Sequence, residues 1–180
     1  MVPSPHHLSI RPATKTQCQA RSGRSRREPR RPPLRCGRRA TDFPATSALI
    51  LLDTSGLVGL FDRRDGRHAD ARAAWSRVRR AAAPLLVTDL IVAETVTLLR
   101  RRAGHAVAVR AGDRLMSGDV AEMVVADAEL LEKGWLLFRA YHDEVLSLTD
   151  CGSFALMKQR RIAQAFAFDD DFRAAGFRLV

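Results

Sequence analysis

The fold is constrained most strongly by apolar runs, largely continuous, that alternate with segments of helical periodicity. These runs lie at residues 48–52, 83–87, 120–125, 162–168 and 177–180. A strand buried on both faces shows such a run, whereas a strand with one solvent-exposed face alternates apolar and polar residues. Doubly buried strands that alternate with helices predict a parallel sheet covered on both faces, which is an α/β/α sandwich.

Helical periodicity and capping residues place helices between these runs. The predicted helices cover residues 55–62, 67–83, 89–103, 105–118, 127–141, 149–161 and 170–176. Thr88 or Asp89 is the expected N-cap of one of them, and Thr149 is the expected N-cap of another. The short stretch 144–148 is predicted to be extended.

Positive charge is concentrated at the start of the chain. The net charge is +10, yet residues 47–180 are nearly neutral, because Arg-rich and Pro-rich sequence fills residues 1–46. This composition cannot bury enough apolar surface to fold alone, so a disordered extension before a domain at 47–180 is predicted. A start codon assigned too far upstream, an RNA-binding arm and an organellar transit peptide are the alternatives.

Two classes of protein fit the sequence poorly. No segment reaches the roughly 18 consecutive apolar residues of a membrane span, so a cytoplasmic protein without membrane contact is expected. Cys18, Cys36 and Cys151 lie far apart without metal-like spacing. They are therefore interpreted as free thiols in a reducing compartment rather than as a disulfide or a zinc site.

Four acidic residues occupy positions where apolar residues are expected: Asp53, Glu94, Asp150 and Asp169. Each aspartate could simply cap a helix or begin a turn. Glu94 is harder to explain in this way, because an unpaired Glu on an apolar helix face is disfavoured. The carboxyl ends of parallel strands share one edge, where ligands usually bind. Carboxylates gathered there suit Mg²⁺ or Mn²⁺, which commonly serve phosphodiester hydrolysis.

The segments that carry these acids resemble the four acidic motifs of PIN-domain ribonucleases, particularly VapC-type toxins of toxin–antitoxin pairs. The segments are LLDTSGLVGLFD, TDLIVAETVTLLRRR, LSLTDCGSFALMKQRRI and AFAFDDDFRAAGF. The resemblance spans about residues 48–180 and implies a PIN-like fold and an Mg²⁺- or Mn²⁺-dependent endoribonuclease.

The resemblance also implies roles for individual residues. The acid quartet would be Asp53, Glu94, Asp150 and Asp169, all candidate metal ligands, with Asp53 and Asp150 the best candidates for direct contact. Ser55 and Ser153 would hydrogen-bond the carboxylates or metal waters. The fourth acid stays open between Asp169 and Asp171, since three consecutive aspartates stand in the last motif.

Partners follow from the same resemblance: an RNA substrate, a small antitoxin and a second copy in a homodimer. Residues 57–61, with Trp75 and Val78, could form an apolar groove for an antitoxin helix, or could simply be core. Arg100, Arg101 and Arg102 form the main cluster of candidate phosphate contacts, although helix ends commonly carry such residues. Further candidates are Arg63, Arg64, Arg67, Lys158, Arg160 and Arg161.

Two other functions remain possible from the sequence. A phosphatase of the haloacid dehalogenase type also has Asp after its first strand, but it requires a second Asp where Ser55 stands. A catalytically silent PIN-like module would bind RNA or protein without cutting. The presence of all four acids argues against such a module.

Overall fold

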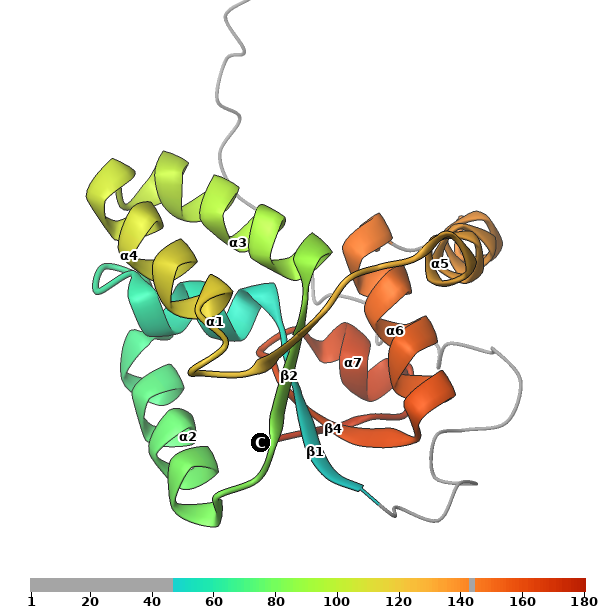
Figure 1. The fold of residues 1–180 in the computed structure, drawn as a ribbon, viewed down its shortest axis with the longest axis horizontal. Coiled ribbons are helices and arrows are strands. Elements are labelled where there is room, and N and C mark those ends of the chain that lie inside the picture. The colour runs from blue at the N-terminus through green and yellow to red at the C-terminus, as the bar shows by residue number, and fades with distance from the viewer. Residues whose placement is uncertain (1–46, 143–144) are drawn as a thin grey trace, which may run out of the picture. The chain divides into compact units, whose positions relative to one another are not determined.

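A computed structural model describes residues 47–142 and 145–180 (Figure 1). In these ranges, five strands form one sheet in the order β3-β2-β1-β4-β5, and all neighbouring strands are parallel. The strands are β1 (Ser47–Leu52), β2 (Leu85–Thr88), β3 (Glu122–Val124), β4 (Ile162–Phe166) and β5 (Arg178–Leu179). The predicted parallel α/β architecture is therefore confirmed.

Helices connect the strands and cover both faces of the sheet. They are α1 (Thr54–Phe61), α2 (His68–Ala81), α3 (Asp89–Arg102), α4 (His105–Met116), α5 (Ala128–Ala140), α6 (Leu148–Arg160) and α7 (Asp170–Ala174). Figure 1 shows α1, α2 and α4 on one side of the strands and α5, α6 and α7 on the other. Helix α3 packs against α1 and α4.

The core is built around the central strand β1. Leu51 pairs with Leu86 of β2 on one side and with Ala165 of β4 on the other. Leu51 and Leu52 are completely buried, because helices cover both faces of the strand. Burial on both faces explains why the run has no polar residue until Asp53 ends it.

Helix α6 begins earlier than predicted. Its first residue is Leu148 and its N-cap is Ser147, so the prediction of Thr149 as the cap is wrong. The prediction of an extended segment at 144–148 is also wrong in its described part, because residues 145–147 are irregular and Leu148 is already helical. Ser147 begins the helix because its side chain satisfies an N–H group of the first turn.

Several predictions concern residues outside the described ranges, among them the basic extension at 1–46 and the thiols of Cys18 and Cys36. Cys151 is described, and it is a buried free thiol as predicted. Within 47–142 and 145–180, no helix is both long enough and apolar enough to cross a membrane.

Candidate active site

Asp53 lies where β1 passes into α1, and its side chain is 2% exposed. It is the N-cap of α1: its Oδ2 accepts hydrogen bonds from the Ser55 backbone N–H at 2.9 Å and from the Ser55 hydroxyl at 2.6 Å. The Asp53 N–H donates to the carbonyl of Phe166 at the end of β4. Asp53 therefore caps a helix and also presents a buried carboxylate at the carboxyl edge of the sheet.

Ser55 joins two segments that are far apart in the sequence. Its Oγ donates to Asp53 and accepts a hydrogen bond of 2.9 Å from the backbone N–H of Phe168. This hydroxyl holds the segment after β4 beside the end of β1. The predicted hydrogen bond from Ser55 to a carboxylate is present.

Glu94 is half-buried in α3, and its position is set by Thr54 of α1. The Thr54 hydroxyl donates to Glu94 Oε2 at 2.6 Å. The sequence interpretation missed this contact, because the two residues are 40 positions apart and no local pattern joins them. The only signal was the unusual acid on an apolar helix face, which needs a polar partner.

Asp150 belongs to a reciprocal cap at the start of α6. Its Oδ2 accepts hydrogen bonds from the backbone N–H and the hydroxyl of Ser147, both at 2.8 Å. The Ser147 hydroxyl in turn accepts the Asp150 N–H, which completes a capping box. The sequence interpretation missed Ser147, although the Ser-x-x-Asp spacing in LSLTD is the signature of this cap.

The other predicted supporting residues differ in their placement. Ser153 lies one turn after Asp150, but its buried hydroxyl has no hydrogen-bond partner among the described residues. Asp169 is exposed and occupies the N-cap position of α7 without a side-chain cap bond. Asp171 lies inside α7.

One cleft of about 490 Å³ brings the four predicted acids together. Asp53, Glu94, Asp150 and Asp169 all line it, although they come from four separate segments of the chain. We call this the acidic cleft; Asp171 is not among the described residues that line it. Leu146, Val145, Phe168 and Leu98 supply apolar parts of its wall.

Negative charge in the acidic cleft is poorly compensated. Burial raises the pKa of Asp53 from 3.8 to about 7, and the charges of Asp150 and Asp169 add to this rise. Burial also raises the pKa values of Glu94 and Asp150, with a further contribution from Asp169 in each case. Hydrogen bonds from Ser55, Thr54 and Ser147 oppose these shifts without cancelling them. A cation would stabilise all of these carboxylates in their charged form.

The donor chemistry of the acidic cleft suits a hard divalent cation, because every candidate ligand is a carboxylate oxygen. No group of three His, Cys, Asp or Glu side chains in the described part of the chain is gathered closely enough to form a preformed cage. Asp53, Glu94 and Asp150 are each held by a different hydroxyl.

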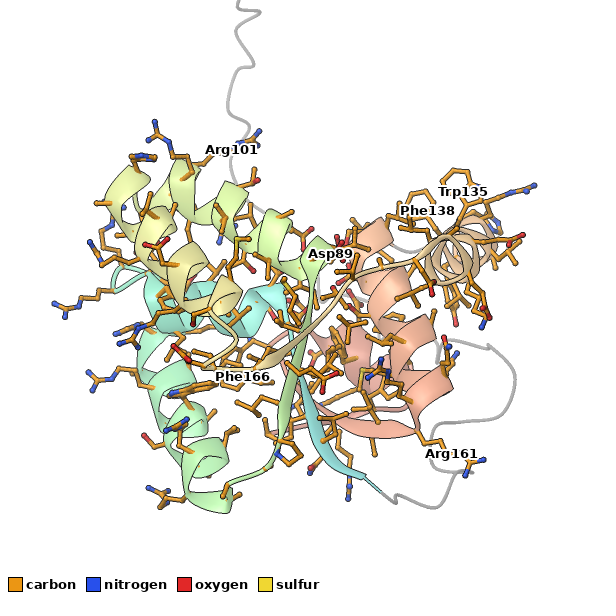
Figure 2. The ribbon with its side chains drawn as sticks, in the orientation of Figure 1. Asp89, Arg101, Trp135, Phe138, Arg161 and Phe166 are labelled. Carbon is orange, nitrogen blue, oxygen red and sulfur yellow. The ribbon has the colours of Figure 1, made fainter. Side chains whose placement is uncertain are left out.

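Of the predicted arginine cluster, only Arg102 lines the acidic cleft. Its guanidinium lies 3.8 Å from Asp65, and its carbonyl accepts a hydrogen bond from Arg64. Arg101 projects outward at the end of α3, and Arg161 lies beyond the end of α6 that is opposite Asp150 (Figure 2). Arg160 pairs with Glu122 at 3.6 Å, at the start of β3.

Of the two interpretations of residues 57–61, Trp75 and Val78, the structure favours the core over an apolar groove for an antitoxin helix. Leu57 and Val78 are buried, and Trp75 packs edge-on against Phe166 with ring centroids 5.5 Å apart. These side chains belong to the core, which was the alternative interpretation. Amphipathic periodicity identifies an apolar face but not the partner that covers it.

Replacing Ser55 with Ala is expected to lower the RNA cleavage that the resemblance implies by roughly 10–100-fold, the effect typical of removing the partner of a metal ligand, which is the role that the resemblance implies for Asp53. The change leaves Asp53 without its 2.6 Å hydrogen bond and releases the N–H of Phe168. The rate of RNA cleavage by the purified variant measures this effect. Ser76→Ala is the matched control, since that hydroxyl bonds only a carbonyl of its own exposed helix; equal rates for the two variants would contradict the role of Ser55.

Comparisons with known proteins identify the family of the chain. The family model described as "PIN domain" matches residues 50–178. The 23S rRNA-specific endonuclease VapC20 of Mycobacterium tuberculosis is 38% identical over 131 residues, which covers 72% of this chain and 95% of that protein.

A solved structure shows the same similarity in three dimensions. The crystal structure of Mycobacterium tuberculosis VapC20, described as a sarcin–ricin loop cleaving toxin, superposes with a TM-score of 0.64 at 35% identity. The match covers 71% of this chain and 95% of that one. The acidic cleft and these matches together show that the chain belongs to the PIN-domain family, among its VapC-type toxins.

Proposed function

We propose that this chain is a divalent-metal-dependent endoribonuclease and the toxin of a toxin–antitoxin pair. The observation that carries the proposal is the acidic cleft, where four carboxylates from four separate segments lie at the carboxyl edge of a parallel sheet. Membership of the PIN-domain family supports nuclease chemistry at this position. The family match to residues 50–178 also supports residues 47–180 as the nuclease domain.

The proposed substrate is an unpaired loop of ribosomal RNA. The relatives are named for cleavage of 23S rRNA and of the sarcin–ricin loop, and they share more than a third of their residues with this chain. Such a substrate places the activity in the cytoplasm, where ribosomes are. An open cleft suits a splayed loop better than a regular duplex, because unstacked nucleotides can enter it.

Each acid has a proposed role in the acidic cleft. Asp53 and Asp150 would hold Mg²⁺ or Mn²⁺ directly, and Glu94 and Asp169 would add negative charge around the cation. A bound divalent cation would lower the pKa of a water molecule so that it ionises near neutral pH, and it would stabilise negative charge on the phosphate oxygens. Ser55, Thr54 and Ser147 orient the carboxylates of Asp53, Glu94 and Asp150, respectively.

The reaction needs no protein nucleophile. The oxygen of water bonds to the phosphorus, the bond from phosphorus to the 3′ oxygen breaks, and the leaving oxygen takes up a proton. Ser153, the buried hydroxyl of α6 that has no hydrogen-bond partner among the described residues, does not line the acidic cleft. The proposal therefore assigns attack to water rather than to a side chain.

A metal titration with a labelled RNA tests the proposed function. The probe is a stem–loop RNA with the sarcin–ricin sequence, incubated with the full chain in EDTA or with rising Mg²⁺ or Mn²⁺. Cleavage that depends on the cation supports the nuclease. Binding without cleavage would point to a silent module, and phosphate release from a small monoester would point to a phosphatase; either result would contradict the proposal.

The metal-free protein is expected to lose stability as pH rises. Burial raises the pKa of Asp53 from 3.8 to about 7, so between these values the folded chain retains a proton that the unfolded chain releases. Stability then falls across this interval, by on the order of 4 kcal/mol for a shift of this size. Added Mg²⁺ should reverse the loss above about pH 7, because the cation favours the ionised carboxylate.

Urea unfolding at about pH 5 and about pH 8, with EDTA or with Mg²⁺, measures this effect. Asp53→Asn serves as the matched control, since its amide does not ionise. A wild-type chain whose unfolding midpoint is the same at both pH values in EDTA would contradict the proposed electrostatics of the acidic cleft.

The proposed protein partners are an antitoxin and a second copy of this chain. An antitoxin that inserts a basic side chain would complement the acidic cleft.

The proposed contact with a second copy lies on the outer face of α5. Exposed Trp135 and Phe138 stack on each other there, with ring centroids 5.5 Å apart (Figure 2). Helix α5 carries charges of both signs, so two copies related by a two-fold axis could pair opposite charges. Sedimentation of wild type and of Trp135→Glu tests the homodimer: the variant should sediment as a monomer.

A further inference from the structure

Arg67 stands at the rim of the acidic cleft and is held by contacts to the segment after β4. Its side chain donates a hydrogen bond of 2.7 Å to the carbonyl of Phe168. Its guanidinium carbon lies over the Phe168 ring, 5.6 Å from the centroid. Arg67 and Phe168 are 101 positions apart in the sequence, so this pairing is created by the fold.

Neighbouring residues hold both Arg67 and Phe168 in place. The Phe168 ring packs edge-on against buried Phe166 at 6.2 Å, and the Phe168 N–H is held by Ser55. The Arg67 N–H donates to Asp65 at 2.9 Å, immediately before α2 begins. The ring beneath the Arg67 guanidinium carbon is therefore fixed by its own neighbours.

The two arginines that line the acidic cleft differ in their ion pairs. Arg102, the other arginine that lines the acidic cleft, forms an ion pair with Asp65, whereas Arg67 makes no ion pair with any described carboxylate. Its exposed guanidinium accordingly retains both its charge and an outer face. Guanidinium planes supported on an aromatic ring stack readily on unpaired bases.

We propose that Arg67, supported by Phe168, stacks on the unpaired base next to the scissile phosphate. This inference rests on the proposed ribonuclease function and extends it to how the substrate is held. The cleft volume of about 490 Å³ is in the range of pockets that take a single small ligand, as an unpaired nucleotide would be. Arg67 contacts RNA, and Phe168 is a positioning residue that acts through it.

The test compares Arg67→Lys, Phe168→Leu and the control Arg72→Lys. Lysine keeps the positive charge of Arg67 but lacks its planar guanidinium group. Arg72, the control position, is an exposed residue of α2 that does not line the acidic cleft. With the sarcin–ricin stem–loop as substrate, Arg67→Lys and Phe168→Leu should each raise KM by about tenfold with kcat little changed, the effect expected of one lost base stack. Arg72→Lys should stay within about twofold of wild type.

Two further measurements separate stacking from a general structural role. The double variant should be no weaker than Arg67→Lys alone, because both changes remove one stack. An RNA that lacks the base beside the cleaved bond should bind wild type and Arg67→Lys equally, measured in an Asp150→Asn background. Equal KM values for Arg67→Lys and Arg72→Lys, with active wild type, would overturn this inference alone. A wild type that cleaves neither this RNA nor ribosomal RNA would overturn the proposed function and this inference together.

Discussion

Asp150→Asn is expected to lower the rate of RNA cleavage by at least about a thousandfold, which corresponds to about 4 kcal/mol of transition-state stabilisation. The change removes one negative charge from the acidic cleft while keeping the size of the side chain. Asn can still accept the hydrogen bonds that Ser147 donates, so the start of α6 should persist. Asp53→Asn should have a similar effect, since both carboxylates are proposed to hold the cation.

The loss must be shown to come from chemistry rather than from unfolding. Circular dichroism and urea unfolding should show Asp150→Asn folded and at least as stable as wild type, because Asp150 and Asp53 repel each other without a cation. Asp113→Asn is the matched control: it removes an exposed carboxylate of α4 that does not line the acidic cleft. An Asp150→Asn protein that keeps a tenth or more of wild-type activity would contradict the assignment.

Gly56→Ala is expected to destabilise the fold by at least about 3 kcal/mol, which is large against the roughly 5–15 kcal/mol that stabilises a typical domain. A Cβ at this position would lie 2.3 Å from the Phe166 carbonyl oxygen and 2.6 Å from a carbon of its ring. Neither group of Phe166 can move away easily, because its carbonyl accepts a hydrogen bond from the Asp53 N–H and its ring packs against Trp75. Helix α1 would have to move away from β4.

The unfolding midpoint in urea measures this destabilisation. Gly66→Ala is the matched control, because a Cβ there meets nothing within 4 Å. The control should change stability by less than about 0.5 kcal/mol, as surface substitutions usually do. Since Asp53 and Ser55 closely precede Gly56, the acidic cleft should also be disturbed. A Gly56→Ala protein as stable as Gly66→Ala would show that α1 and β4 are not packed as described.

The sheet could be predicted from sequence because its strands are buried on both faces. The run ending at Leu52 has no polar residue, and this continuity distinguishes a central parallel strand from an edge strand. The four acids could be predicted for a related reason. A carboxylate at the end of a buried strand, or on an apolar helix face, costs free energy unless it is paired or holds a ligand. The placement of Asp53 and Asp169 on one cleft follows from the parallel topology, because each comes shortly after the carboxyl end of a parallel strand.

The remaining errors arise where local pattern does not determine the contact. The hydrogen bond between Thr54 and Glu94 depends on how α1 lies beside α3, which no short-range pattern specifies. Residue type favours Thr149 as the start of α6, because Thr is a good cap, but the helix is capped by Ser147, since Asp150 reciprocates its hydrogen bond. The apolar residues around Trp75 were compatible with a groove or with core, and only the packing against Phe166 decides between them.

The most direct test of the central claim is to identify the ends that wild type leaves on RNA cut in isotopically labelled water with Mg²⁺. Attack by water with departure of the 3′ oxygen predicts a 3′-hydroxyl and a 5′-phosphate that carries the label, with no product in EDTA. A 2′,3′-cyclic phosphate opposite a 5′-hydroxyl, formed equally well in EDTA, would mean that the ribose hydroxyl attacks. That result would contradict a metal-dependent reaction at Asp53, Glu94, Asp150 and Asp169.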